Sequence, residues 1–135
     1  MIRVVYLDSS AITKLLVADE TERLDLRSYL SSRPDRAASV VARVEVARAL
    51  SRRDAAHDRE LRNVWAGVSS IPLDRTVIER ASIIEPPRLR TLDAIHLASA
   101  MELGGDLDAL VTYDVKLAAA ARAAGLPVES PGMDG

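Results

Sequence analysis

Short apolar runs alternate along the chain with longer segments in which apolar residues recur at helical spacing. The first run, Val4–Leu7, stops at Asp8, which is typical of a buried strand. Pro72 weakens the prediction for a later strand, because proline cannot donate a hydrogen bond to a sheet ladder. Besides the first, the expected strands are 37–39, 71–73 and 109–112, with a last one starting at Val128.

The segments between these runs have the pattern and the boundaries of helices. Ser9 or Ser10 is suited to cap the first helix, which should end at about Val17. Ser39 and Thr91 are suited to cap two later helices. One face of the helix after Ser39 carries apolar residues at helical spacing, namely Val40, Val44, Ala47 and Leu50. The later helices are expected over 20–30, 40–53, 58–68, 75–84, 91–103 and 115–124.

Strands that alternate with helices predict an α/β fold with a parallel sheet. The chain has 135 residues, of which 48% are apolar, so it can form one core but has little room for a second domain. No internal repeat, linker or low-complexity tract divides it. We therefore expect a single domain over 1–130 and a disordered tail over 131–135.

Composition narrows the environment in which the protein works. The absence of cysteine excludes disulfides and thiol chemistry and favours a reducing compartment. No apolar run has membrane-spanning length, and the apolar start is too short for a signal peptide. We therefore expect a cytoplasmic protein. The net charge of -2 does not indicate nucleic acid, although all 18 basic residues except Lys14 and Lys116 are arginines. Arginine binds phosphates bidentately, and a genome-wide arginine bias is the alternative explanation.

Several catalytic motifs are absent from the sequence. It contains neither the phosphate loop G-x-x-x-x-G-K-[ST], nor the dinucleotide fingerprint G-x-G-x-x-G, nor the nucleophile elbow G-x-S-x-G. Without cysteine, His57 and His96 are too few for a histidine zinc site. Carboxylates remain as the chemically active groups, and their oxygens suit hard cations such as Mg²⁺ or Mn²⁺.

Four carboxylates occupy positions that a parallel sheet brings to one edge. Asp8 and Asp114 follow apolar strands, and ligands of open α/β sheets bind at the carboxyl ends of the strands. Asp93 lies in the first turn of a helix that begins at the same edge, and Glu45 lies within two turns of another helix start. Two such charges about 4 Å apart repel by roughly 1 to 4 kcal/mol. A rim of this kind suits two cations, which can activate water and stabilise a leaving oxygen in phosphodiester cleavage.

Each carboxylate also has an ordinary structural explanation when it is taken singly. Asp8 suits a turn after a strand, and Glu45 can pair with Arg48 on the helix surface. Asp93 is favoured near the positive end of its helix, and Asp114 can cap the helix that follows it. Only the four positions together favour a metal site.

Four segments in sequence order surround these carboxylates. They are YLDSSA at 6–11, SVVARVEVARAL at 39–50, LRTLDAIHLA at 89–98, and VTYD at 111–114 with KL and AAGL following it. The four segments resemble the motifs of the PIN-domain family, and specifically of the VapC-type toxins of type II toxin–antitoxin systems. The resemblance covers essentially the whole chain, and the third segment is the closest match.

The resemblance implies a fold, an activity, a cofactor and partners. The implied fold is a three-layer α/β/α sandwich with a parallel sheet ordered 3-2-1-4-5. The implied activity is that of an Mg²⁺- or Mn²⁺-dependent endoribonuclease, with a cognate antitoxin that blocks the site and with a homodimer as the assembly. By position, the metal-binding acids are Asp8, Glu45, Asp93 and Asp114, with Ser10 and Thr112 as supporting hydroxyl residues. Asp114 matches the acid whose role varies most in the family.

Three further residues are secondary candidates. His96 lies one turn after Asp93 and is placed to orient that carboxylate, whereas a locally satisfied packing histidine is the simpler explanation. Arg48 and Arg52 follow Glu45 on one helical line and are candidates for contact with RNA phosphates. Pairing of these arginines with neighbouring acids is the alternative.

Two other functions remain open from the sequence. One is a non-catalytic binding module that keeps the PIN fold. The other is a phosphoryl-transfer or receiver-type α/β domain that uses Asp8 as nucleophile or phospho-acceptor. The second lacks the aspartate two positions after Asp8 that aspartyl phosphatases use, because Ser10 stands there. Metal-dependent cleavage of RNA separates these functions from a nuclease.

Overall fold

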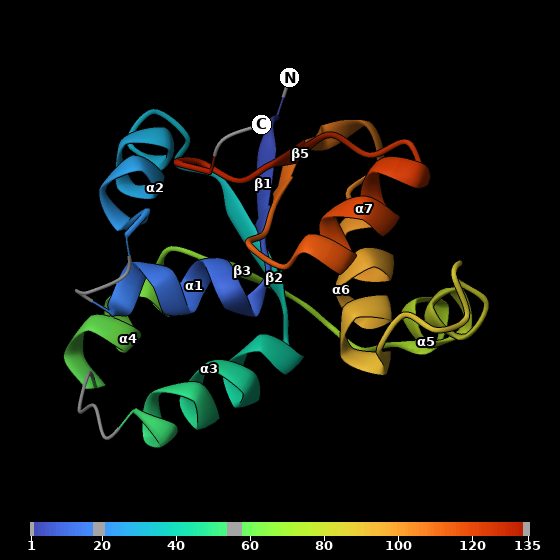
Figure 1. The fold of residues 1–135 in the computed structure, drawn as a ribbon, viewed down its shortest axis with the longest axis horizontal. Coiled ribbons are helices and arrows are strands. Elements are labelled where there is room, and N and C mark those ends of the chain that lie inside the picture. The colour runs from blue at the N-terminus through green and yellow to red at the C-terminus, as the bar shows by residue number, and fades with distance from the viewer. Residues whose placement is uncertain (1, 18–20, 54–57, 134–135) are drawn as a thin grey trace.

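The computed structural model describes residues 2–17, 21–53 and 58–133, which form an α/β fold around one parallel sheet (Figure 1). The strands are β1 (Val4–Leu7), β2 (Arg36–Ser39), β3 (Ser69–Ile71), β4 (Leu107–Val111) and β5 (Val128–Glu129). The described helices are α1 (Ser9–Leu16), α2 (Arg23–Leu30), α3 (Val41–Arg52), α4 (Asp58–Ala66), α5 (Arg75–Ser82), α6 (Thr91–Met101) and α7 (Val115–Ala123), with a 3₁₀ turn at Gly104–Asp106.

The sheet has the order β3-β2-β1-β4-β5, which confirms the predicted order 3-2-1-4-5. All neighbouring strands pair in parallel, and Leu7 at the end of β1 is aligned with Val111 at the end of β4. The chain leaves β1 toward β2 on one side and later crosses to β4 on the other. The carboxyl ends of β1 and β4 therefore form the switch point at which open α/β sheets bind ligands.

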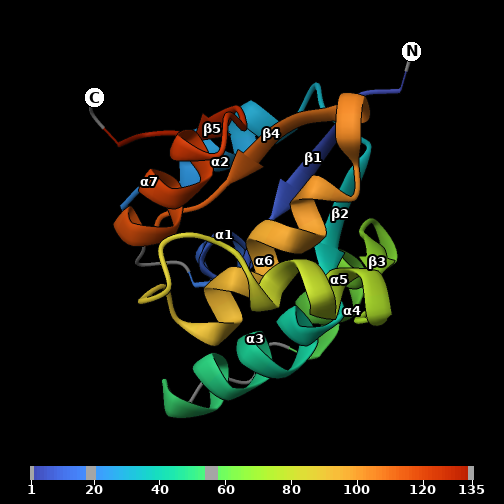
Figure 2. The ribbon, with the colours of Figure 1, turned by 90° about the vertical axis from the view of Figure 1, so that its right-hand side faces the viewer.

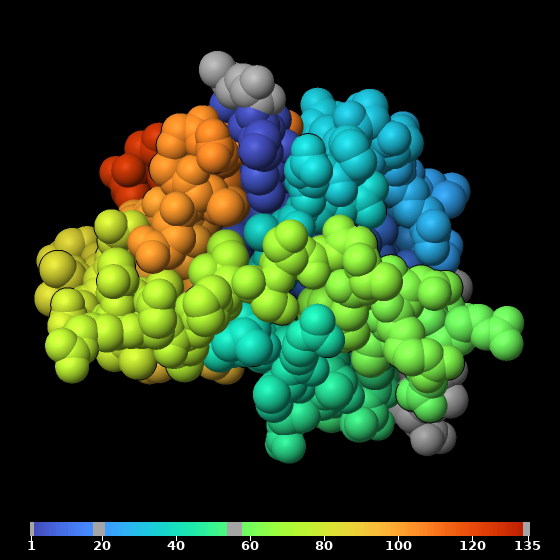
Figure 3. All heavy atoms as spheres, turned by 180° about the vertical axis from the view of Figure 1, so that it is seen from behind, coloured from blue at the N-terminus to red at the C-terminus, as the bar shows by residue number. Residues whose placement is uncertain are grey.

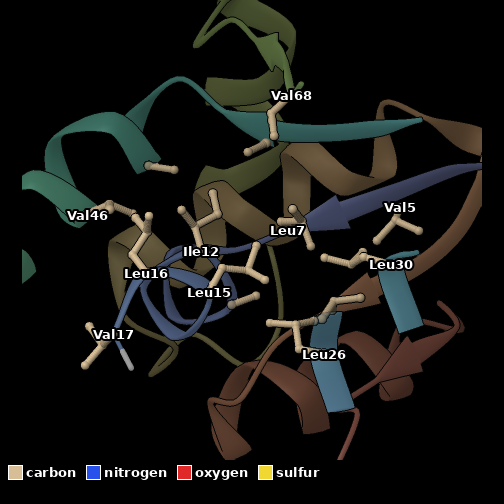
Figure 4. Close-up of a cluster of buried hydrophobic side chains, with 14 of the residues drawn as sticks. Val5, Leu7, Ile12, Leu15, Leu16, Val17, Leu26, Leu30, Val46 and Val68 are labelled. Atoms are coloured by element: carbon tan, nitrogen blue, oxygen red, sulfur yellow. The ribbon is translucent and has the colours of Figure 1, made fainter. Parts of the chain in front are cut away.

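Helices cover both faces of the sheet, so the predicted three-layer sandwich is confirmed. Figures 1 and 2 show α1–α4 on one side of the sheet and α5–α7 on the other. Side chains of β1 alternate between the two sides. Val5 and Leu7 pack with α1, α2 and α3 in one aliphatic core (Figure 4), whereas Tyr6 packs with α6 and α7 in the second.

Three predicted helix caps are shifted by one residue. Asp8, rather than Ser9 or Ser10, caps α1, because its carboxylate accepts a hydrogen bond from the Ala11 N–H. Val40 is the N-cap residue of α3, although the Ser39 hydroxyl still accepts from the Val41 N–H at 3.3 Å. Similarly, Arg90 precedes α6 in extended conformation, and Thr91 is the first helical residue.

The predicted apolar face of α3 is wrong at every position except Leu50. Val40 and Val44 are exposed, and so is Ala47, whereas the buried line of α3 consists of Ala42, Val46 and Leu50. This line packs against α1 in the first core. Both lines are apolar at helical spacing, so periodicity alone did not distinguish them.

Other boundaries also differ from the sequence prediction. β3 ends before Pro72, which removes a residue without an N–H from the sheet ladder. The predicted second helix starts at Glu20, which lies outside the described residues, and α2 begins at Arg23. The space-filling view from behind shows the green to yellow segment from α4 through β3 to α5 lying across that face (Figure 3).

The end of the chain returns to the edge of β4. The Tyr113 hydroxyl donates to the Pro131 carbonyl at 2.7 Å, and the Ser130 hydroxyl donates to the Thr112 carbonyl at 2.6 Å. Asp134 and Gly135 lie outside the described residues, and disorder of 131–135 stays a prediction. Among the helices that the structure describes, none has the length and apolar character needed to cross a membrane.

Candidate active site

Asp8 and Asp114 lie at the ends of neighbouring strands, where their side chains cap the helices that follow. One Asp8 carboxylate oxygen, Oδ1, accepts from the Ala11 N–H at 2.9 Å. Asp114 Oδ1 accepts from the N–H groups of Lys116 and Leu117 at 2.8 and 3.0 Å. The capping role that the sequence offered as an alternative for Asp114 is therefore real, and it holds this acid at the switch point.

Ser10 and Thr112 both hold the Asp8 carboxylate. The Ser10 hydroxyl donates to Oδ1 at 2.7 Å, and the Thr112 hydroxyl donates to Oδ2 at 2.5 Å. The same two hydroxyls also accept hydrogen bonds from the backbone that follows β4. The Tyr113 N–H donates to Ser10, and the Asp114 N–H donates to Thr112. Asp8 is only 3% exposed, so these contacts fix its orientation and tie α1 to the end of β4.

Glu45 approaches the same edge from α3. Its Oε1 accepts from the Ser9 hydroxyl at 2.5 Å and lies 2.7 Å from His96 Nε2. Ser9 directly follows Asp8, so this hydrogen bond links α3 to the start of α1. Among the ion pairs between described residues, none joins Glu45 to Arg48, which was the ordinary explanation for Glu45.

Arg90 connects Asp93 to Asp114. It was not among the candidate residues predicted from the sequence. Its Nε donates to Asp93 Oδ2 at 3.0 Å, and its Nη2 donates to Asp114 Oδ2 at 2.6 Å. Asp93 lies in the first turn of α6 and is 9% exposed. The only signal in the sequence was the spacing of Arg90 three residues before Asp93, since such pairs are neighbours near a helix.

All four predicted acids are connected through a few protein donors. Thr112 joins Asp8 to Asp114, Arg90 joins Asp114 to Asp93, and Ser9 joins the start of α1 to Glu45. Within 2–17, 21–53 and 58–133, no three Asp, Glu or His side chains converge closely enough to form a metal-binding group by themselves. The sequence led us to expect four carboxylates that repel one another directly. In the structure, hydrogen-bond donors from Thr112, Arg90 and Ser9 lie between them instead.

The fold, the strand order and these acids can now be compared with known proteins. The family model for the PIN domain matches residues 5–123, which includes every residue of the site. The chain belongs to the PIN domain family.

Relatives of this PIN domain are similar over nearly their whole length. It is 44% identical to Ribonuclease VapC46 of Mycobacterium tuberculosis (strain ATCC 25618 / H37Rv), over 94% of this chain and 97% of that protein. It is 40% identical to Ribonuclease VapC47 of M. tuberculosis (strain CDC 1551 / Oshkosh), over 95% of this chain and 97% of that protein. A solved toxin–antitoxin complex from Klebsiella pneumoniae has a chain with the same fold, at a TM-score of 0.70 and 22% identity, covering 96% of this chain and 99% of that chain.

Asp8 and Glu45 have opposite electrostatic surroundings in this PIN domain. Burial raises the pKa of Asp8 above its ordinary value, and the hydrogen bonds from Thr112, Ser10 and Ala11 only partly oppose this effect. For Glu45, burial also acts to raise the pKa, but hydrogen bonds from His96 and Ser9 and the charge of Arg90 outweigh it and lower the pKa. Burial thus disfavours the charged form of Asp8, whereas at Glu45 the opposing contacts prevail.

The donor chemistry of the site fits a divalent cation. The quartet offers carboxylate oxygens, which are the ligands that Mg²⁺ and Mn²⁺ prefer, and no cysteine competes for a softer metal. Burial disfavours the charged form of the Asp8 carboxyl and raises its pKa, so a bound cation would offset that penalty. Asp8, Glu45, Asp93 and Asp114 are the residues that would hold the ion.

Proposed function

We propose that this PIN domain is an Mg²⁺- or Mn²⁺-dependent endoribonuclease and the toxin of a type II toxin–antitoxin system. The observation that carries the proposal is the buried Asp8 at the β1–β4 switch point, held by Ser10 and Thr112 and linked to three further acids on one edge. Relatives named as ribonucleases match nearly the whole chain, which supports RNA as the substrate.

Each side chain of the site has a separate task in this proposal. Asp8, Glu45 and Asp93 are the main ligands, and Asp114 completes the site. When bound, the cation supplies Lewis-acid activation of water and stabilisation of the leaving oxygen. Thr112 and Ser10 keep the Asp8 carboxylate in one orientation, so that it is preorganised to bind the cation.

Arg90 has a second role in this proposal, as the group that meets the RNA backbone. Its side chain is 70% exposed and already pairs with two acids of the site. A cation bound by those acids would take over the neutralisation of their charge. The guanidinium would then be available for a phosphate oxygen, which it can bind bidentately.

The burial of Asp8 distinguishes the proposal from the phosphoryl-transfer alternative. Its carboxylate accepts three hydrogen bonds and is almost completely buried, which leaves no room for in-line attack on a phosphorus atom. A small cation needs only one lone pair, and Oδ2, which accepts a single hydrogen bond, from Thr112, can supply it. A non-catalytic binding module would keep the fold without any use for a buried acid whose pKa is raised. The structure therefore favours hydrolysis at the site over both alternatives.

The proposed partners follow from the family. We propose that a cognate antitoxin blocks the site, that the protein forms a homodimer, and that it acts in the cytoplasm. A groove of about 690 Å³ between α5 and α6 offers an apolar surface for a protein partner, with Leu73, Ile78 and Ile83 among its lining residues. These side chains are all exposed in the single chain.

The experiment that tests the proposed function is cleavage of RNA by the purified protein. We expect endonucleolytic products with Mg²⁺ or Mn²⁺ and none with EDTA, because the acids alone provide no Lewis acid to activate water and stabilise the leaving oxygen. Restoring the metal after EDTA should restore cleavage. Cleavage that persists in EDTA would contradict the metal role, and RNA binding without cleavage in any metal would favour the non-catalytic module.

Arg48 and Arg52 should contribute to RNA binding through phosphate contacts. Both are exposed on α3, and neither takes part in an ion pair with another described residue, so the alternative of pairing with nearby acids is not what the structure shows. Replacing either by alanine should weaken binding and reduce the slope of log affinity against log salt by about 1. Arg75→Ala, at an exposed position on α5, is the control. Unchanged slopes in both variants would make these arginines structural.

A further inference from the structure

We propose that His96 is a positioning residue that holds Glu45 of the metal site through a hydrogen bond, and that Tyr6 fixes the His96 ring for this task. The proposal rests on the proposed function, because it assigns the support of one metal ligand. It also corrects the sequence hypothesis in which His96 orients Asp93. In the structure the contacts of His96 are with Glu45, Ser9 and Tyr6.

Both ring nitrogens of His96 are engaged. Nε2 lies 2.7 Å from Glu45 Oε1 and 3.2 Å from the Ser9 hydroxyl, and Nδ1 lies 2.6 Å from the Tyr6 hydroxyl. The His96 side chain is 2% exposed. A ring whose two nitrogens are both occupied has no free nitrogen for a proton from water, so His96 is not the general base.

The hydrogen bonds of Tyr6 determine which nitrogen of His96 carries the proton. The Tyr6 hydroxyl accepts from the Ser39 N–H at 3.1 Å. A tyrosine hydroxyl carries its proton at neutral pH. That proton is then donated to His96 Nδ1, which leaves the Nε2–H to donate to Glu45. The histidine therefore presents a donor, and not an acceptor, to the carboxylate.

This network joins four elements of the fold at Glu45 Oε1. Tyr6 lies on β1, His96 on α6, Ser9 on α1 and Glu45 on α3. Glutamate has a long, flexible side chain, and Glu45 starts from a helix at the outside of the sheet, so it would otherwise adopt several rotamers. Donors from His96 and Ser9 fix Oε1 and leave Oε2 to face a cation. Partners of metal ligands act in this way, and their loss costs about 10- to 100-fold in metal affinity or activity.

Two substitutions separate the positioning role from simple packing. His96→Gln places an amide donor near the position of Nε2 and keeps the hydrogen bond to Glu45. His96→Asn keeps an acceptor near the position of Nδ1 for Tyr6 but loses the donor toward Glu45. Both variants lose the ring and its packing, and each keeps one of its two contacts: His96→Gln keeps the one with Glu45 and His96→Asn keeps the one with Tyr6.

The first measurement is Mn²⁺ binding to each variant, by electron paramagnetic resonance of the free ion, together with the Mn²⁺ concentration that gives half-maximal RNA cleavage. His96→Asn should weaken both by about 10- to 100-fold, whereas His96→Gln should stay within a few-fold of the wild type. Equal Mn²⁺ binding by wild type and His96→Asn, or equal losses in both variants, would overturn the proposal.

A second measurement determines the tautomer of His96 in the wild-type protein, so it does not depend on whether a variant at position 96 folds. The ¹⁵N shifts of histidine in the wild-type protein, assigned by comparison with a His57→Gln variant, report the tautomer of His96. We expect an Nε2–H donor and an unprotonated Nδ1. An Nδ1–H tautomer would contradict the proposed direction of the hydrogen bonds. If the wild type binds Mn²⁺ but cleaves no RNA, the proposed function fails while these binding and tautomer results still decide the role of His96.

Discussion

Replacing Asp8 with asparagine should lower the rate of RNA cleavage at least about 100-fold, since even partners of metal ligands are worth 10- to 100-fold and Asp8 is proposed as a direct ligand. The fold should survive, because asparagine is as good a helix cap as aspartate and can still accept from Ser10 and Ala11. The measurement is the initial cleavage rate at saturating Mn²⁺, with circular dichroism to verify the fold.

Asp74→Asn is the matched control for this prediction. Asp74 caps α5 through a hydrogen bond from the Val77 N–H at 3.0 Å, which is the same contact that Asp8 makes with Ala11. Asp74 is exposed and does not belong to the site. Wild-type activity in Asp74→Asn with loss in Asp8→Asn would assign the effect to the site. Full activity in Asp8→Asn would remove Asp8 from the metal site.

The difference in melting temperature between Asp8→Asn and the wild type should depend on pH. Because the pKa of Asp8 is raised in the folded protein, its charge penalises the folded state as the pH rises through and above that pKa. In EDTA at neutral pH, Asp8→Asn should therefore melt at a higher temperature than the wild type. The difference should shrink as the pH falls through the folded pKa toward the ordinary value of 3.8. A difference that does not change with pH would mean that the charge of Asp8 is not its origin.

Expression of the wild-type protein without a partner should stop bacterial growth, and Asp93→Asn should abolish this effect. The reason is that uncontrolled cleavage of cellular RNA blocks protein synthesis, and that Asp93 is a proposed ligand at the start of α6. Growth curves after induction, with immunoblots to equalise protein levels, are the measurement. Asp106→Asn, at an exposed position in the turn before β4, should remain toxic.

The toxin role and the nuclease role can fail separately. If wild-type protein accumulates without harm and is recovered as an active ribonuclease, the toxin role is contradicted and the nuclease role stands. If growth stops equally with Asp93→Asn, the arrest does not come from the proposed site.

The position of Asp8, directly after a strand, was predictable from the sequence. Val4–Leu7 ends at a charged residue, and that boundary places Asp8 at the edge of the sheet in the structure. The order of the strands came from the family resemblance and not from periodicity, because strand order depends on how helices cross over the sheet.

The contacts between side chains were not predictable in the same way. Arg90 meets Asp114 across 24 residues, and Tyr6 meets His96 across 90. No local pattern encodes such pairs, since they depend on which helix face turns toward the sheet. The face of α3 illustrates the difficulty, because its two apolar lines differ only in which one packs against α1. The role of His96 depended on that packing and therefore had to come from the structure.

Titration of Mn²⁺ into the wild-type protein and into Asp8→Asn, followed by calorimetry, tests the central claim most directly. The claim is that the acids at the β1–β4 switch point form a site for a divalent cation. It predicts saturable binding to the wild type and a dissociation constant at least about 10-fold higher in Asp8→Asn. A wild-type protein that binds no Mn²⁺ at millimolar concentration, or an Asp8→Asn variant that binds it equally well, would contradict the claim.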